Sequence, residues 1–84
     1  MHTQQRIDAL KRSSKHWEHR LRKLAEGRDE LIGWQNDGVA YLNSSGENVL
    51  PSLIEEAEEA VQRVLKILTE VESLRDRAMR GEKV

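Results

Sequence analysis

Between Leu50 and Met79 the apolar residues repeat every seven positions, and this repeat constrains the fold more strongly than any other feature of the chain. Three neighbouring series carry it. The first core series is Leu50, Ala57, Val64, Val71 and Ala78, the second core series is Leu53, Ala60, Ile67 and Leu74, and the flanking series is Ile54, Val61, Leu68 and Arg75. A stripe of this width is typical of a helix that packs on more than one neighbour in a bundle.

Signals at both ends predict that this helix covers residues 52–80. Ser52 and Glu55 have the spacing of a capping box, in which a hydroxyl and a carboxylate bind the free amides of the first turn. Pro51 suits the entry to a helix. Arg80 and Gly81 favour an end there, because cations and glycine suit the carboxyl end of a helix. We expect residues 81–84 to form a frayed tail.

A second helix is predicted upstream, where apolar residues again follow a heptad-like spacing from residue 3 to residue 26. The residues at that spacing are Ile7, Leu10, Ser14, Trp17, Leu21 and Leu24. Ser14 is the one polar residue in this pattern. Three glycines, at positions 27, 33 and 38, then weaken the helix, since each glycine inside a helix costs roughly 1 kcal/mol relative to alanine.

The sequence leaves two structures open for the middle of the chain. In the first, which the helix-forming residues on both sides favour, one helix covers residues 3–43, with a break at 27 or 36–38, and a loop covers residues 43–51. In the second, the helix ends near Gln35 at the turn signal Asn36-Asp37-Gly38, and residues 39–43 pair with residues 48–50 as a short β-hairpin.

Folding the chain at this loop predicts an all-α antiparallel helical hairpin, with residues 1–84 as a single domain. Equal rise along both helices places Leu24 opposite Leu68 and Trp17 opposite Arg75. We expect the Arg75 guanidinium to lie over the indole of Trp17. A chain of 84 residues with 37% hydrophobic residues and no Phe builds only a thin core from two helices. The hairpin is therefore expected to be completed to a three- or four-helix bundle by self-association or by a partner.

The charges are separated along the chain. Residues 1–28 carry eight Lys or Arg and three Asp or Glu, residues 29–60 carry eight acidic residues and no Lys or Arg, and residues 61–84 carry six basic and four acidic residues. The loop end of the hairpin is therefore acidic and the other end basic. Two hairpins packed antiparallel would pair these ends and close a four-helix bundle with two-fold symmetry.

The composition excludes several kinds of chemistry. The chain has no Cys, so it has no disulfide and no thiolate metal ligand, and we expect no cofactor. His16 and His19 could share a metal but have no third ligand at helical spacing, so they are predicted to be a surface pair. No apolar run is long enough to cross a membrane, and the N-terminus is too polar for a secretory signal. We expect a cytoplasmic or intracellular protein without membrane contact.

One acidic cluster resembles a known metal-binding motif. Glu55, Glu56 and Glu59 form an E-E-x-x-E pattern that could present carboxylates to Mg²⁺. The pattern resembles the first metal-binding helix of the all-α nucleotide pyrophosphohydrolases, the MazG-like family. That family follows it with E-x-x-D on a later helix, whereas the only E-x-x-D here is Glu26–Asp29, upstream of the cluster. A solvated helix face is the preferred interpretation, and a magnesium-dependent enzyme is kept as a second alternative.

A basic face on the first helix gives a first alternative function. Its members are Lys11, Arg12, Lys15, Arg22 and Lys23. Clustered cations of this kind are typical of proteins that bind nucleic-acid phosphates. The preferred interpretation is a solvated face, with a small nucleic-acid-binding regulator as the alternative.

A third pattern concerns the order of the helices. The predicted first helix carries a Trp in the stretch Glu30–Trp34 and continues to Tyr41–Asn43 and a polar loop, and the long heptad helix follows. Residues 24–79 in this respect resemble the first two helices of a spectrin repeat. The third helix of that repeat is missing, and two glycines stand inside the first. The resemblance implies a spacing or docking role and a gap that another chain fills.

These patterns together predict a non-enzymatic protein–protein interaction module, acting as a scaffold, adaptor or co-chaperone-like protein. Its partner is expected to be a second copy or a helix of another chain. The residues predicted at the interface are Trp17, Leu21, Leu24, Leu31, Trp34, Leu42, Ile54, Val61, Leu65 and Leu68. Leu65 is the most informative of them, because it lies off the main stripe and indicates a second contact surface.

Overall fold

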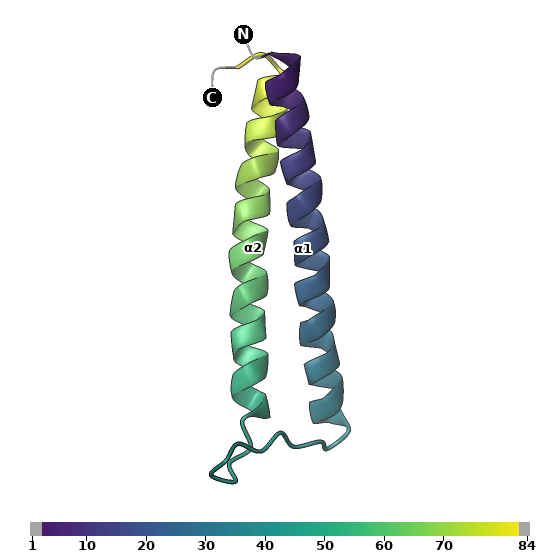
Figure 1. Ribbon diagram of the computed structural model, residues 1–84, viewed down its shortest axis with the longest axis vertical. Coiled ribbons are helices and arrows are strands. Elements are labelled where there is room, and N and C mark those ends of the chain that lie inside the picture. The colour runs from purple at the N-terminus through teal and green to yellow at the C-terminus, as the bar shows by residue number, and fades with distance from the viewer. Residues whose placement is uncertain (1–2, 83–84) are drawn as a thin grey trace.

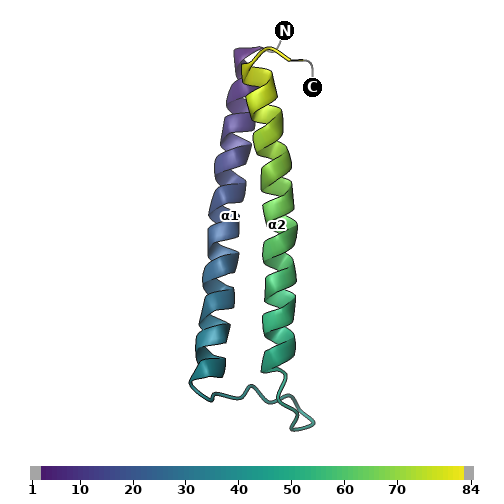
Figure 2. The same ribbon diagram turned by 180° about the vertical axis from the view of Figure 1, so that it is seen from behind.

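The computed structural model describes residues 3–82 as two long helices joined by a loop (Figure 1). Helix α1 covers Gln4–Asn36 and helix α2 covers Leu50–Met79. The two helices lie side by side in the front and back views, with the start of α1 and the end of α2 at one end and the loop at the other (Figures 1 and 2). The predicted all-α helical hairpin is confirmed.

Helix α1 begins at a capping threonine. The Oγ1 atom of Thr3 accepts a hydrogen bond from the backbone N–H of Arg6 at 3.2 Å, and the Thr3 carbonyl accepts the N–H groups of Arg6 and Ile7. A threonine in this position satisfies amides that have no partner inside the helix. The helix then passes through Gly27 and Gly33 without interruption, so the break considered at residue 27 is absent.

The end of α1 is set by Gly38. This glycine has a φ of +77°, the left-handed conformation that glycine adopts without steric cost. The N–H of Gly38 donates to the carbonyl of Gln35 at 3.1 Å, and the N–H of Val39 donates to the carbonyl of Trp34 at 2.9 Å. These two bonds form a Schellman motif, which ends the helix. The continuous helix to residue 43 is therefore wrong, and the alternative that ends near Gln35 is confirmed.

The predicted β-hairpin in the loop exists in a reduced form. Leu42 and Asn48 form a single antiparallel bridge, and the N–H of Val49 donates to the carbonyl of Tyr41 at 2.8 Å. Leu50, which was expected to belong to the second strand, is instead the first residue of α2. A ribbon this short is marginal without other support.

Two asparagine side chains give the loop that support. Asn43 Oδ1 accepts the backbone N–H of Ser45 at 2.9 Å. Asn48 Oδ1 accepts the N–H of Tyr41 at 3.1 Å and the N–H of Leu50 at 3.2 Å. Asparagine favours turns because its side chain can replace missing backbone partners in this way. Asn48 thus joins the loop to the first residue of α2.

Helix α2 begins two residues earlier than predicted. The residue at its N-cap is Val49, which has no side-chain hydrogen bond to the helix, and Pro51 lies in the first turn. Ser52 is already inside the helix, so the predicted capping box with Glu55 is not formed. Asn48, from outside the helix, instead accepts the N–H of Leu50, the first residue of α2.

The end of α2 agrees with the predicted exit signals. Gly81 has a φ of +80°, and the N–H of Glu82 donates to the carbonyl of Arg77 at 2.9 Å, as in a second Schellman motif. The predicted frayed tail at residues 81–84 lies partly outside the described residues, which end at Glu82. Gly81 itself closes the helix.

The core is a thin seam along the elongated hairpin, whose dimensions are 59 × 18 × 17 Å. Its buried apolar side chains are Leu50, Val61, Val64, Leu68 and Ala78, all from α2. Ser14 is the buried residue of α1. Within residues 3–82, neither helix combines the length and the apolar character that a membrane-spanning helix needs.

Candidate interaction surface

The seam uses only part of the apolar stripe on α2. Val64 from the first core series and Val61 and Leu68 from the flanking series are buried against α1. In the second core series, by contrast, Ile67 and Leu74 are each 37% exposed. Helix α1 therefore covers the first core series and the flanking series. The second core series lies along one edge of the contact.

Two polar contacts between the helices lie along the other edge. Nη1 of Arg75 donates to the hydroxyl of Ser14 at 3.0 Å, and Nη1 of Arg28 donates to Glu58 Oε2 at 3.2 Å. We call this the polar edge, defined by Ser14, Arg28, Glu58 and Arg75. Ser14 and Arg28 both belong to the seven-residue series that also contains Ile7 and Leu21. Ser14 and Arg28 interrupt this apolar series, and each is bound by a side chain of α2.

Arg28 is held by two carboxylates. Its Nε atom lies 3.1 Å from Asp29 Oδ1, and its Nη1 atom lies 3.2 Å from Glu58 Oε2. The hydrogen bond to Asp29 and the negative charges of Asp29 and Glu58 raise the pKa of Arg28, against the opposing effect of partial burial. Because the pKa of an arginine already lies far above neutrality, Arg28 stays charged throughout the physiological pH range.

The predicted contact between Arg75 and Trp17 is wrong. The guanidinium of Arg75 bonds the hydroxyl of Ser14 instead, and Arg75 also lies 3.1 Å from Asp76. Arg20 is the cation over Trp17, with its guanidinium carbon 5.7 Å from the ring centroid. The physical reason is that Ser14 is buried, and a buried hydroxyl without a partner would be unfavourable.

The edge opposite the polar edge forms a continuous apolar strip. In an antiparallel pair, the two edges of the contact carry residues from opposite sides of each stripe. On the polar edge, the series of Ser14 in α1 meets the series of Arg75 in α2. The series of Trp17 in α1 and the series of Ile67 in α2 therefore meet on the other edge. We call that strip the open face: it consists of Leu10, Trp17, Leu24 and Leu31 from α1, and Leu53, Ala60, Ile67 and Leu74 from α2. None of its members is fully buried.

The structure divides the predicted interface residues into three groups. Val61 and Leu68 are buried in the seam; Trp17, Leu21, Leu24, Leu31 and Ile54 are half-buried; Trp34, Leu42 and Leu65 are exposed. Trp34 lies beside Leu31 at the rim of the open face, whereas Leu42 belongs to the loop. Leu65 follows Glu58 by seven residues, which places it along the polar edge.

Sequence reasoning missed Ile67 and Leu74 as surface residues. The repeat placed both at core positions, and a repeat alone does not say which of three series faces the neighbouring helix. The width of the stripe was the available signal, since one neighbour cannot cover three series.

The residues of the alternative functions lie on the outer surface. The five cations of the proposed basic face are all exposed, and so are His16 and His19. Lys23 lies 3.7 Å from Glu26. Among residues 3–82, no three His, Asp or Glu side chains are grouped in a way that could hold a metal ion. Glu55, Glu56 and Glu59 therefore do not converge on a metal position.

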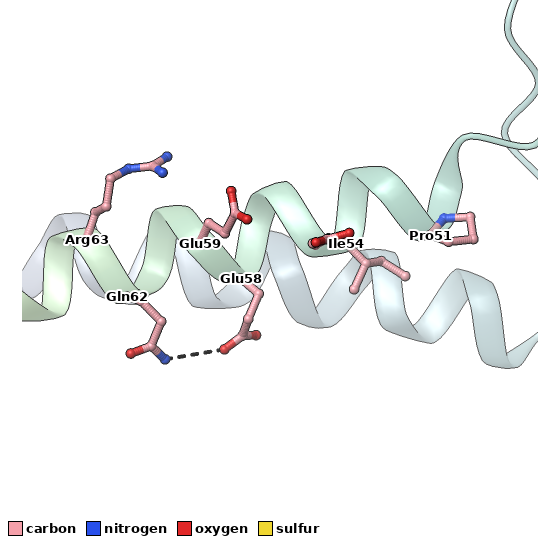
Figure 3. A pocket seen from close by; sticks show the side chains of 7 residues that line it. Pro51, Ile54, Glu58, Glu59, Gln62 and Arg63 are labelled. Carbon is pink, nitrogen blue, oxygen red and sulfur yellow. Dashed lines mark hydrogen bonds between the residues drawn. The ribbon is translucent and has the colours of Figure 1, made fainter.

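A hollow of about 590 Å³ lies on α2 near the loop (Figure 3). Its lining residues, from Pro51 to Arg63, all belong to this one helix. Glu58 and Gln62, joined by a 3.4 Å hydrogen bond, lie on one side of the helix, and Glu59 and Arg63 on the other. A ligand site buries most of its ligand between several walls, so this surface is not a ligand pocket.

Comparison with known proteins adds no relative. No family model matches the chain, and no curated protein and no solved structure matches it. The resemblances to a spectrin repeat and to the pyrophosphohydrolases therefore stay predictions.

Proposed function

We propose that this protein is a non-enzymatic protein–protein interaction module that forms oligomers through its open face. One observation carries the proposal: helix α1 covers the second core series of α2 only in part. Ile67 and Leu74, at core positions of the repeat, are each 37% exposed. A contiguous apolar strip along a soluble protein is characteristic of an interaction surface.

The free energy available on this face is comparable with the stability of a small domain. Full burial of a Leu or Ile side chain stabilises by about 1.5–3 kcal/mol, and each residue of the open face is already partly buried in the hairpin. Covering the rest of eight such residues would contribute several kcal/mol. A domain of this size has a net stability of only about 5–15 kcal/mol. Association would therefore add substantially to a thin core.

The proposal is tested by the mass in solution of three full-length proteins over a concentration series. In Ile67→Glu a charge is placed on the open face. In the matched control, Thr69→Glu, the same charge is placed on the exposed outer side of α2. We expect the wild type and Thr69→Glu to form the same assembly. We expect Ile67→Glu to lose about 2 kcal/mol of association free energy or more, because its carboxylate would be buried without a partner.

Two results would contradict this proposal. One is a folded monomer at every concentration, which would show that the open face stays exposed to solvent in the folded protein. The other is an assembly that Ile67→Glu leaves intact, which would show that the contact lies elsewhere on the hairpin. Circular dichroism of each variant establishes that the helices are retained.

A further inference from the structure

We propose that a second copy of this chain covers the open face, with its loop at the opposite end of the bundle. In this dimer α2 lies antiparallel to the partner's α2, and α1 lies antiparallel to the partner's α1. The inference rests on the proposed function, because it names the partner of the same surface. The charges that border the open face, the position of the two-fold axis and the area available for contact support it.

The border of the open face on α2 alternates in charge. Three residues after each member of the second core series stand Glu56, Arg63, Glu70 and Arg77, all exposed and seven residues apart. Antiparallel packing about the point between Arg63 and Glu70 reverses this order in the partner. Arg63 then meets the partner's Glu70, and Glu56 meets the partner's Arg77. Each pair occurs twice by symmetry, and bordering charges of this kind select the orientation of paired helices.

The apolar residues of α2 share the same centre. Ile67 lies near the two-fold axis and packs against its own copy. Ala60 meets the partner's Leu74, a small residue against a large one. The second core series and the charged border therefore specify one register.

The same axis gives an apolar contact between the two α1 helices. Because α1 ends at Asn36 and α2 begins at Leu50 at the same end of the hairpin, the centre of α2 is level with about residue 20 of α1. Trp17 then faces the partner's Leu24. Arg20 comes close to its own copy, one like-charge contact against four opposite-charge pairs on α2. The guanidinium of Arg20 lies over its own Trp17.

The other two-fold arrangement lacks this charge matching. With both loops at the same end, α2 would lie against the partner's α1. The border of the open face on α1 is Arg6, Ser13, Arg20, Gly27 and Trp34, which contains no carboxylate. Arg63 would find no opposite charge on that border. The acidic loop end of one copy would also lie beside the acidic loop end of the other.

The open face is large enough for a stable dimer. The 30 residues of α2 extend about 45 Å, and the hairpin is 18 Å wide. The face therefore offers on the order of 800 Å² on each copy, close to the area that each partner contributes to a standard stable interface.

Disulfide trapping of the full-length protein tests the arrangement, since the chain has no Cys of its own. We expect Ile67→Cys to form a covalent dimer on mild oxidation, because the two sulfurs lie near the axis. Leu65→Cys, along the polar edge of the same helix, is the control and should form no covalent dimer under the same conditions. A mixture of Ile67→Cys and Arg20→Cys should give two homodimers. A mixed disulfide as the main product would show the loops at the same end and overturn the inference.

Charge reversal tests the register. Arg63→Glu and Glu70→Arg each turn two attractive pairs into two repulsive ones, so each should raise the dissociation constant of the dimer about tenfold. The double variant restores both pairs and should return to within about twofold of the wild type. Lys66→Glu, exposed on the outer side, changes the net charge as much as Arg63→Glu does and should leave the dissociation constant unchanged.

The outcomes separate this inference from the proposed function. An assembly that persists in solution but shows no rescue in the double variant would overturn the inference and leave the interaction module standing. A monomeric wild type would overturn both. Rescue together with the Ile67→Cys disulfide would support the arrangement with opposed loops.

Discussion

Arg75 in α2 donates a hydrogen bond to the hydroxyl of Ser14 in α1 at 3.0 Å, and this bond joins the helices toward the end farthest from the loop. Ser14 is only 1% exposed, although the repeat would favour a Leu at its position. A small side chain leaves space for the guanidinium, and the guanidinium satisfies a hydroxyl that burial would otherwise leave without a partner. Ser14, a polar residue in the apolar pattern of α1, and Arg75, the cation in the flanking series of α2, are therefore the two partners of one hydrogen bond.

Replacing Ser14 with Leu should weaken the hairpin, even though it makes the heptad pattern more regular. The larger side chain has no space in the seam and would also displace the guanidinium of Arg75. We expect the free energy of unfolding in urea to fall by about 1–3 kcal/mol. Ser73→Leu, the same change at an exposed position of α2, is the control and should leave it within about 0.5 kcal/mol. A more stable Ser14→Leu protein would show that the seam is not closely packed there.

Arg28 offers the opposite case, because its ion pair lies closer to solvent. The carboxylate side chain of Glu58 is 47% exposed, so the pair contributes only about 0–1 kcal/mol. Arg28→Leu would extend the apolar series of Ile7 and Leu21, and we expect it to raise the free energy of unfolding by about 1 kcal/mol. Arg28→Ala loses the packing of the aliphatic stem as well as the pair, and should lower it by about the same amount.

Urea unfolding of both variants, with Arg22→Leu as an exposed control, measures this difference. If Arg28→Leu is as unstable as Arg28→Ala, the ion pair contributes more to stability than the packing does. The two predictions together separate a polar residue that the seam requires from one that it tolerates.

Most of α2 could be predicted from the sequence because three apolar series point to the same helix. The end of α1 stayed open, because the helix-forming residues on both sides favoured a longer helix whereas Asn36-Asp37-Gly38 is a turn signal. The left-handed conformation of Gly38 decides for the turn. The start of α2 was misplaced for a related reason. The pattern of Ser52 and Glu55 was visible in the sequence, whereas the hydrogen bonds that Asn48 accepts from Tyr41 and Leu50 were not.

The candidate surface was predicted only in part. The repeat identified Val61 and Leu68 as contact residues, and the structure uses them inside the hairpin rather than toward a partner. Which apolar series of α2 remains exposed depends on the rotation of α1 about its own axis. The polar contacts of Ser14 and Arg28 with α2 indicate that rotation. Their positions in one seven-residue series were readable, but their partners lie 61 and 30 residues away in the sequence.

Asn48 should be the residue that starts α2, and Ser52 should have no part in it. Asn48→Ala removes the acceptor for the N–H groups of Tyr41 and Leu50, and should lower the free energy of unfolding by about 1 kcal/mol. Asn48→Asp keeps an oxygen in that place and adds a charge that suits a helix start, so it should be as stable as the wild type. Thermal unfolding of these two variants and of Ser52→Ala checks the assignment. A loss in Ser52→Ala as large as that in Asn48→Ala would place the start of the helix at the predicted capping box.

Two glycines five residues apart in sequence should respond to alanine in opposite directions. Gly33 lies inside α1, and a Cβ added there would meet no atom within 4 Å. Gly33→Ala should therefore raise the free energy of unfolding by up to about 1 kcal/mol, because alanine favours the helix. A Cβ on Gly38 would also meet no atom, but its φ of +77° is one that alanine adopts only with strain. Gly38→Ala should lower the free energy of unfolding by about 1–2 kcal/mol.

Denaturant unfolding of both variants measures the two effects, and hydrogen exchange at Val39, whose N–H closes the Schellman motif, locates the effect of Gly38→Ala. Equal stability of the two variants would mean that α1 does not end at this glycine in solution, and that the longer helix suggested by the sequence is populated after all.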